Sequence, residues 1–298
     1  MSAAPAPLRS LRQPRMDSSD FQQIAQILKR KAGLTLAADA QKLVLSRLSK
    51  RILALRLCDF SDYLDLITGP EGEAELAAMI DALTTNTTRF FREPEHFEIL
   101  ERVAMPRLIR KARAGRRVRL WSAACSSGEE PYSIAATVAR CFPDASRFDL
   151  KILATDINRH VLRIGAAAQY EARIAAGIPE TMRRLMFAGD EDRDEMQIRP
   201  ALRDLVTFRY LNFVDPWPVS GPFDIIFCRN VAIYMDTHMQ QRLWSGLERV
   251  LDQNGLLFIG HSERLGTALS DRLTLFAPTA FRRPYSETRP PARTKESL

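Results

Sequence analysis

One stretch, residues 118–135, constrains the fold more than any other part of this chain. It reads VRLWSAACSSGEEPYSIA: a short apolar run, six small residues, Gly128 and then a segment of helical character. Proline is tolerated in the first turn of a helix, because the N–H that it lacks would be unpaired there, so Pro131 marks a helix start. The stretch predicts a strand at 118–122, a turn and a helix at 131–141. Such a unit can hold a ligand, since small side chains let the backbone approach it.

The residues of the turn indicate what kind of ligand could bind. The stretch has neither a Gly-x-Gly-x-x-Gly nor a Gly-Lys-Ser/Thr pattern, and Glu129 and Glu130 stand where a pyrophosphate would lie and would repel it. A ligand with a positive group and no phosphate fits better, and S-adenosylmethionine, with its amino group and sulfonium, is one. Taken alone, the stretch is explained equally well as an ordinary strand-to-helix turn whose acidic residues favour the helix dipole.

The composition is that of a globular protein, since 46% of the 298 residues are apolar and 27% are charged. No apolar run approaches the roughly 20 residues that cross a bilayer, so we expect no direct membrane insertion. Residues 1–16 lack the apolar core of a secretory signal, and we expect them to be a disordered lead. The net charge of +7 indicates an acidic partner without specifying its class.

The cysteines and histidines show no metal-binding pattern. The cysteines lack a Cys-x-x-Cys pair, and the histidines lie far apart in the sequence, so we expect a reduced cytoplasmic location and no metal. The cysteines are Cys58, Cys125, Cys141 and Cys228, and the histidines are His96, His160, His238 and His261.

Residues 17–83 have the pattern of a small all-helical domain. Apolar residues recur at helical spacing from Phe21 onward, and Gly33 ends the first helix. Further helices are predicted at 40–57, 60–68 and 74–83.

The second of these helices is basic. It carries five basic residues and no acid, and Arg47, Lys50 and Arg51 share one face because they are three and four residues apart. The pattern alone leaves two interpretations open: a solvated basic face, or a docking surface for an acidic helix.

Residues 84–93 connect the helical part to the rest of the chain. Threonine and asparagine favour loops and caps over helix interiors, which is typical of a linker. A flexible linker rarely carries two aromatic residues and two arginines in four positions, however, and residues 89–92 are Arg-Phe-Phe-Arg.

Helices and strands alternate after residue 97, which predicts a doubly wound α/β sheet. Residues 166–204 are irregular and polar, and we expect an insertion with one or two short strands there. Helices are expected at 97–114, 131–141, 158–167 and 237–251, and strands at 118–122, 150–154, 205–213, 222–228, 255–259, 273–277 and 279–283.

Polar residues recur where the predicted strands end, which is the edge at which such sheets bind ligands. Asp156 follows the second strand, where an acid hydrogen-bonds ribose hydroxyls in dinucleotide folds, and it could also cap the next helix. Five such clusters on one edge are stronger support than any single one. They are residues 122–130, Asp156, Asn212, residues 229–230 and residues 261–263.

Four motifs are long and occur in a set order: TTNTTRFFRE at 84–93, AACSSGEEPYS at 123–133, FCRNVAIYMD at 227–236 and GHSE at 260–263. In these motifs the sequence closely resembles the chemotaxis receptor methyltransferase (CheR) family, over about residues 17 to 283. The resemblance implies a helical docking domain at 17–83 and a Rossmann-like S-adenosylmethionine methyltransferase domain at 84–285. The small β-subdomain of the family would fall at 166–204, and residues 286–298 would form a disordered tail.

The resemblance also implies an activity. Family members methylate glutamate side chains on the cytoplasmic helices of chemoreceptors, giving γ-glutamyl methyl esters and S-adenosylhomocysteine. Glutamate is ionised at neutral pH, so this transfer needs no general base. Two alternatives remain: a non-catalytic S-adenosylmethionine-binding module, and a nucleic-acid methyltransferase. The fourth strand ends in Cys-Arg-Asn-Val, without the Asn/Asp-Pro-Pro-Tyr/Phe signature of amino-group methylation, so we expect no nucleic-acid partner.

The family motifs assign roles to particular residues of this chain. Arg92 and Tyr234 are expected nearest the reacting carboxylate, and the receptor-docking positions correspond to Arg47, Lys50 and Arg51. The expected cofactor contacts are Asn86, Thr88, Arg92, an acid after Gly128 (Glu129 or Glu130) for the methionine portion, Asp156 for the ribose, and Asn212, Phe213, Arg229 and Asn230 for the adenine and the remaining wall.

Some family members also bind a pentapeptide at the C-terminal end of the receptor, through a glycine-containing loop of the β-subdomain. The corresponding region here, near 188–197, is short and acidic and has a single glycine. We therefore do not expect that tether in this protein.

Overall fold

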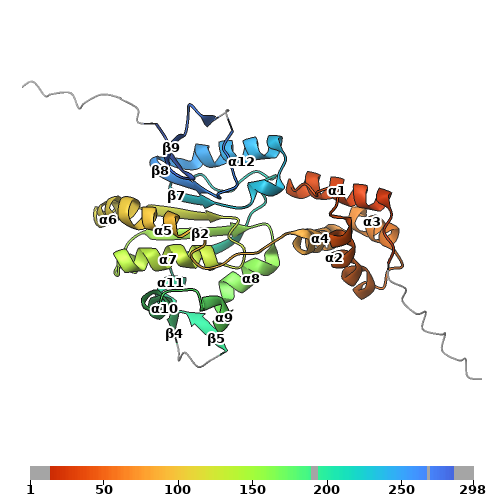
Figure 1. Cartoon of the computed structure of the whole chain (residues 1–298), viewed down its shortest axis with the longest axis horizontal. Coiled ribbons are helices and arrows are strands. Elements are labelled where there is room, and N and C mark those ends of the chain that lie inside the picture. The colour runs from red at the N-terminus through yellow and green to blue at the C-terminus, as the bar shows by residue number, and fades with distance from the viewer. Residues whose placement is uncertain (1–13, 189–193, 267–268, 285–298) are drawn as a thin grey trace, which may run out of the picture.

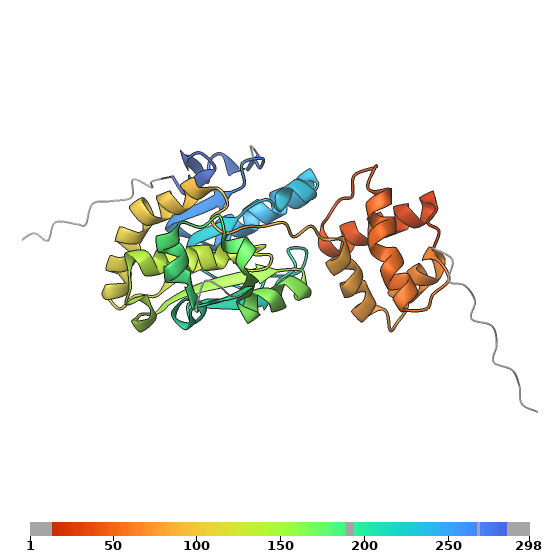
Figure 2. The same ribbon diagram turned by 60° about the horizontal axis from the view of Figure 1, so that its bottom comes forward.

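The computed structural model describes residues 14–188, 194–266 and 269–284. A helical domain and a larger α/β domain are joined by an extended linker (Figures 1 and 2). Most of the predicted lead, the predicted tail at 286–298 and the centre of the 188–197 loop lie outside the described residues. Among the described helices, none is both long enough and apolar enough to span a membrane.

The helical domain has a hydrophobic core of its own, built from residues such as Ile24, Leu48 and Tyr63. Its first helix starts at a capping box, in which Asp17 and Asp20 each accept a hydrogen bond from the backbone N–H of the other. It ends at Gly33, whose φ of 71° is left-handed, which confirms the predicted stop. The helices are α1 (Ser18–Ala32), α2 (Gln41–Ala54), α3 (Phe60–Thr68) and α4 (Glu73–Leu83).

The α/β domain contains a seven-stranded sheet in the order β6-β2-β1-β7-β8-β10-β9. The first five strands in this order pair in parallel and the last two antiparallel, which confirms the predicted Rossmann-like fold. The strands are β1 (Val118–Ala123), β2 (Leu150–Asp156), β6 (Val206–Tyr210), β7 (Phe223–Cys228), β8 (Leu251–Ile259), β9 (Thr274–Ala277) and β10 (Ala280–Arg282).

Helices cover both faces of the sheet (Figure 1). One hydrophobic cluster joins the sheet to α5 (Pro94–Ile99), α6 (Met105–Arg113) and α7 (Glu129–Cys141), and a second cluster joins it to α12 (Thr237–Val250). The helix predicted at 97–114 starts earlier, at Pro94, because proline needs no N–H partner in a first turn. A π-helical segment, Leu100–Ala104, separates α5 from α6.

The insertion is a small β-subdomain, and the prediction of one or two strands for it was wrong. It has three strands in the antiparallel order β3-β5-β4, of which β3 and β4 are too short to show an alternating pattern. Its ring contacts anchor the linker, since Phe90 packs edge-on against Tyr170 and Phe187. Its elements are β3 (Gln169–Glu171), α9 (Ala172–Ala175), α10 (Glu180–Met186), β4 (Phe187–Ala188) and β5 (Glu195–Ile198). The short helix α11 (Pro200–Arg203) leads from it to β6.

The helical domain rests on the carboxyl edge of the sheet through several polar contacts. The Asn212 amide donates to the Lys31 carbonyl at 2.7 Å, and the Thr35 N–H donates to the Tyr234 carbonyl at 2.7 Å. Lys29 Nζ also lies 2.8 Å from a carboxylate oxygen of Asp236. These contacts bring the helical domain against the edge where the sequence predicts a ligand.

Candidate active site

The candidate site lies at the carboxyl end of β1, where the strand order reverses. β1 lies between β2 and β7, and doubly wound sheets bind ligands outside such a point. The loops after β1 and β7 hold Ala124, Ser126 and Asn230 at φ values of 68°, 50° and 58°. This left-handed region is unfavourable for residues other than glycine, so these loops depend on surrounding contacts to keep their shape.

Asp156, at the end of β2, holds the loop after β1. Its carboxylate accepts from the Ser126 N–H at 2.8 Å and from the Asn158 N–H at 2.9 Å. Burial raises the pKa of this carboxyl group, while the backbone hydrogen bonds act to lower it. The cap of helix α8 (Arg159–Ala167) is Asn158 and not Asp156, since the Asn158 Oδ1 accepts from the N–H groups of the first helical turn. Asp156 therefore does not cap the helix, and it lines the wall of a cavity where a ligand could contact it.

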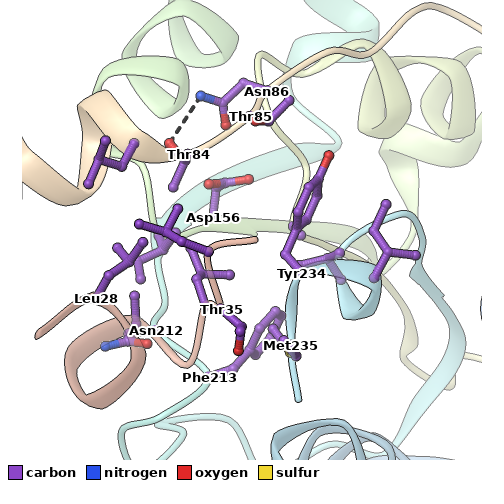
Figure 3. Close-up of a pocket in the computed structure, with 18 of the residues that line it drawn as sticks. Leu28, Thr35, Thr84, Thr85, Asn86, Asp156, Asn212, Phe213, Tyr234 and Met235 are labelled. Atoms are coloured by element: carbon purple, nitrogen blue, oxygen red, sulfur yellow. Dashed lines mark hydrogen bonds between the residues drawn. The ribbon is translucent and has the colours of Figure 1, made fainter. Parts of the chain in front are cut away.

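A cavity of about 320 Å³ lies between the two domains, and we call it the interdomain cavity (Figure 3). Its volume is at the lower end of the range for small-molecule sites. The helical domain supplies one wall, chiefly residues 34–37 with Leu28 and Leu43. Five residues predicted from the sequence line the opposite side: Asn86, Asp156, Asn212, Phe213 and Tyr234.

A second cavity of about 50 Å³ adjoins the first, and we call it the small polar cavity. The two cavities share Asn86 and Ala124, so they form consecutive parts of one site. The predicted residues that line the small polar cavity are Asn86, Thr88, Arg92, Glu130, Arg229 and Asn230.

The two adjacent glutamates of α7 point to different places. Glu130 lines the small polar cavity, accepts from the Ser122 hydroxyl at 2.6 Å and pairs with Arg229 Nε at 2.7 Å. Glu129 lines neither cavity, and its carboxylate accepts from the Ser127 hydroxyl at 2.7 Å. Burial raises the pKa of Glu129. Of the two acids left open by the sequence, only Glu130 lines a cavity of this site.

Arg92 and Tyr234 lie in different parts of the site. Arg92 lines the small polar cavity, where its guanidinium donates to the Thr87 carbonyl at 3.1 Å. Tyr234 lines the interdomain cavity, with its hydroxyl directed toward the side that carries Thr85 and Asn86 (Figure 3).

Arg229 is a buried support of the small polar cavity. Besides Glu130, its guanidinium donates to the Arg92 carbonyl at 2.6 Å and lies 3.2 Å from His96 Nδ1. The other ring nitrogen of His96 lies 2.7 Å from the Thr279 hydroxyl. Burial, followed by the positive charge of Arg229, lowers the pKa of His96 to about 4. His96 is therefore neutral at physiological pH, with Nδ1 as the acceptor.

The sequence positions of the histidines suggested that all four lie far apart, but two of them are close together in the fold. His96 and His261 lie with ring centroids 6.0 Å apart, and one potential ligand atom from each of Glu93, His96 and His261 falls within 4.8 Å of the others. Arg229 occupies the acceptor nitrogen of His96 and also reaches Glu93 at 3.3 Å. A cation bound there would have to displace this guanidinium, so the cluster is better suited to holding Arg229.

Glu263, from the motif after β8, holds the loop that carries Asn230 and Tyr234. One carboxylate oxygen accepts from the N–H groups of Asn230 and Gly260, and the other from those of Val231 and Ala232, at 2.6 to 2.9 Å. The sequence placed Glu263 at the ligand edge but gave it no role. Its partners are 31 to 33 residues away, apart from Gly260, so only the fold identifies them.

Asn212 and Phe213 line the interdomain cavity, and both also make contacts that stabilise the surrounding structure. The Asn212 amide is committed to the Lys31 carbonyl, and its oxygen accepts from the Val214 N–H at 3.1 Å. The Phe213 ring packs against Trp217 with centroids 5.5 Å apart. Asn212 therefore joins the two domains at the cavity wall.

The predicted docking face on α2 is only partly free. Arg47 donates to the carbonyls of Ala82 and Thr84, while Arg51 makes a bidentate pair with Glu75 at 2.6 Å. Hydrogen bonding to Glu75 raises the pKa of Arg51. Lys50 is exposed. Two of the three basic residues thus stabilise the helical domain itself, which corrects the view of this face as a simply solvated one.

The residues present fit S-adenosylmethionine. The interdomain cavity offers apolar walls and one carboxylate, Asp156, at the tip of β2, as a nucleoside requires. The small polar cavity offers a second carboxylate, Glu130, as a ligand amino group requires. The helix α7 begins with this acid and with Glu129, which disfavours a phosphate at its N-terminus.

Comparisons with known proteins agree with this architecture. Residues 19–84 match the family model "CheR methyltransferase, all-alpha domain", and residues 86–280 match "CheR methyltransferase, SAM binding domain".

Named relatives cover most of the chain. A protein of Rhizobium etli named as a probable chemotaxis protein methyltransferase is 44% identical, covering 78% of this chain and 88% of its own. Chemotaxis protein methyltransferase 2 of Pseudomonas aeruginosa is 38% identical, covering 88% of this chain and 92% of its own. The chemotaxis protein methyltransferase of Escherichia coli is 37% identical, covering 89% and 91%. The fold, the ordered motifs and these matches together show that the chain belongs to the CheR methyltransferase family.

Proposed function

We propose that this protein transfers a methyl group from S-adenosylmethionine to glutamate side chains on the cytoplasmic helices of chemoreceptors. The observation that carries the proposal is the pair of adjoining cavities at the strand-order reversal, each with one carboxylate on its wall. The relatives named as chemotaxis protein methyltransferases support the biological setting. The protein would act in the cytoplasm, where those receptor helices lie.

The chain's residues divide the binding work between the cavities. Asp156 would accept hydrogen bonds from ribose hydroxyls, and Phe213 would contact the base in the interdomain cavity. Glu130 would pair with the ligand's amino group in the small polar cavity, where Asn86 and Thr88 complete the wall. S-adenosylmethionine, when bound, supplies a methyl group made electrophilic by its sulfonium.

The remaining residues would position the acceptor. A glutamate side chain, with a pKa of about 4.3, is ionised at neutral pH, so the chain need not remove a proton from it. Arg92 would orient the incoming carboxylate, since a guanidinium is a permanent cation and cannot serve as a base. Tyr234 would donate a hydrogen bond near the transferred methyl. Orientation and exclusion of water would therefore account for most of the acceleration.

Labelled S-adenosylmethionine, incubated with the protein and membranes that contain chemoreceptors, tests the proposal. We expect label on the receptors that base releases as methanol, because carboxyl methyl esters are base-labile. The Arg92→Ala variant should lose most of this transfer. Cofactor binding without any transfer would indicate a regulatory module, and label on nucleic acid would overturn the assigned substrate.

A further inference from the structure

We infer that a basic surface at the end of the α/β domain opposite the candidate active site binds a second acidic segment of the receptor assembly. This inference rests on the proposed function, because it takes the partner from the receptors that the protein would methylate. The surface, which we call the basic end, is formed by α6, the turn that follows it and β10. Its arginines are Arg107, Arg110, Arg113, Arg116, Arg117 and Arg282.

The charge of the basic end is concentrated in one short stretch. Residues 106–117 read PRLIRKARAGRR and hold six basic residues and no acid. The net charge of the whole chain is +7, so this stretch alone accounts for most of the excess. Short runs rich in lysine and arginine are typical of surfaces that bind acidic macromolecules.

The structure leaves much of this charge exposed. Lys111 is the exception, since its Nζ lies 2.6 Å from a carboxylate oxygen of Asp224. Arg110 and Arg116 are exposed, and neither has a hydrogen bond or an ion pair with any residue that the structure describes. An arginine without an internal partner can form a bidentate pair with a carboxylate of another molecule without breaking a contact of its own.

A hollow of about 860 Å³ continues the surface toward the C-terminal strands. Arg107 lines this hollow and shares a helix face with Arg110, because the two are three residues apart. Arg282 also lines it, with its guanidinium 5.1 Å from the centroid of the Phe276 ring. A hollow bordered by arginines fits a protruding segment that carries carboxylates, whereas a flat membrane surface would bridge it without filling it.

The basic end lies at the edge of the sheet opposite the candidate site. Arg116 and Arg117 immediately precede β1, whose carboxyl end borders the site, and the six residues of β1 span roughly 20 Å. Figures 1 and 2 show α6 at the end of the α/β domain away from the helical domain. A straight receptor helix at the carboxyl edge cannot also reach the basic end, so the partner there is a second acidic segment, from another receptor chain.

A double charge reversal tests the basic end. Arg110→Glu combined with Arg116→Glu reverses its charge without removing a contact between described residues. The control is Arg163→Glu combined with Arg173→Glu, which makes the same change in net charge at exposed arginines of α8 and α9.

The readouts are the kcat and KM of methyl transfer to receptors in membranes, and co-sedimentation of the protein with membranes that contain or lack receptors. We expect the double reversal to raise KM about five- to twentyfold with little change in kcat, because the site of transfer is untouched. The increase should shrink in about 0.5 M salt, where screening limits such attraction to a few ångströms. Co-sedimentation with receptor-containing membranes should fall in parallel, and the control should behave like the unchanged protein.

The outcomes separate this inference from the proposed function. If the double reversal matched its control in both assays, the basic end would be refuted while the proposed function stood. Equal binding to receptor-free membranes would assign the surface to lipid, and loss of binding after nuclease treatment would assign it to nucleic acid; either result would overturn the receptor partner. If the unchanged protein transferred no methyl group but bound receptor-containing membranes through these arginines, the proposed function would fail and only the contact would stand. Equal affinity of all variants for S-adenosylhomocysteine shows that each is folded.

Discussion

At the scale of single residues, the neighbours Glu129 and Glu130 show how burial and partners separate two chemically identical side chains. Glu130 sits between the Ser122 hydroxyl and the Arg229 guanidinium, and it also faces the small polar cavity. Glu129 is directed to Ser127, away from that cavity. A ligand amino group would therefore meet one carboxylate and not the other.

Glu130→Gln and Glu129→Gln give a direct comparison. Removing the charge at Glu130 should weaken S-adenosylhomocysteine binding by about ten- to a hundredfold, since a hydrogen bond between charged groups contributes about 1.5–3 kcal/mol. Glu129→Gln should change the affinity by less than about twofold, because it touches neither cavity. Titration calorimetry measures both. Equal losses in the two variants would contradict the assignment of Glu130.

His96 should make the stability of the protein depend on pH. The ring is fully buried and its pKa is lowered to about 4, whereas an unfolded chain has the ordinary value of about 6.5. Between these values the unfolded state binds more protons, so stability falls as pH is lowered through the window. From pH 7 to pH 4 this group alone should remove about 3 kcal/mol from the free energy of unfolding.

The buried carboxyl groups with raised pKa values increase the free energy of unfolding as pH falls, which is the opposite of the effect of His96. A His96→Asn variant is therefore needed as the reference. Asn cannot take up a proton in this range, and its amide oxygen can still accept from Arg229. The difference in unfolding free energy between the unchanged protein and His96→Asn should shrink as pH falls from 7 to 4, as measured by denaturant titration. A difference that stays constant across this range would show that His96 keeps its ordinary pKa.

At the scale of elements, the loop between β7 and α12 depends on a carboxylate from another strand end. Asn230 has a left-handed φ, and four N–H groups converge on Glu263. The Gln side chain has one acceptor oxygen and a donor NH₂ group, so Glu263→Gln would set a donor against two of these N–H groups. We expect faster amide hydrogen exchange at residues 230–232 and a destabilisation of about 2 kcal/mol.

Glu248→Gln is the matched control for the loop. Glu248 is a buried carboxylate of α12 that pairs with Arg272 and Arg283 and has no bond to the loop. Its loss should destabilise the protein without a specific rise in exchange at residues 230–232. If both variants left exchange in the loop unchanged, Glu263 would not be its support.

The strongly periodic elements could be predicted from the sequence, whereas the short ones could not. β1, α7 and β7 have apolar runs, and Gly33 ends α1 as expected, although α7 starts at Glu129, two residues before the predicted start at Pro131. β4 has two residues and β3 has three, too few for an alternating pattern to show. The earlier start of the helix at Pro94 was missed because the preceding residues have linker chemistry.

The candidate site also has a part that could be predicted from the sequence and a part that could not. Its edge of the sheet was predictable, because polar residues after parallel strands meet there. The pairing of Arg229 with His96, and of Glu263 with the β7–α12 loop, joins residues more than 30 positions apart and needed the fold. Likewise the cavity wall from the helical domain could not be anticipated, since the composition of residues 34–43 is that of any helix connection.

At the scale of the whole molecule, the basic face of α2 stabilises the helical domain and is also the proposed surface for docking a receptor helix. Arg51 holds Glu75, which also accepts from the Tyr63 hydroxyl at 2.8 Å, and Arg47 holds the carbonyl groups at the end of α4. These contacts stabilise the helical domain. Lys50 is the exposed member of the face, and therefore the one whose replacement can test docking without disturbing the domain.

Lys50→Glu should lower methyl transfer to receptor-containing membranes by about three- to tenfold, because reversing a surface charge weakens association with an acidic helix. The effect should be larger at low salt, since screening shortens the range of such interactions. Affinity for S-adenosylhomocysteine should not change, because Lys50 lines neither cavity. Lys42→Glu has the same charge change at an exposed position about two turns before Lys50 on the same helix, and it should transfer like the unchanged protein. Equal losses in both variants would point to net charge alone, and full activity of Lys50→Glu would remove α2 from the receptor contact.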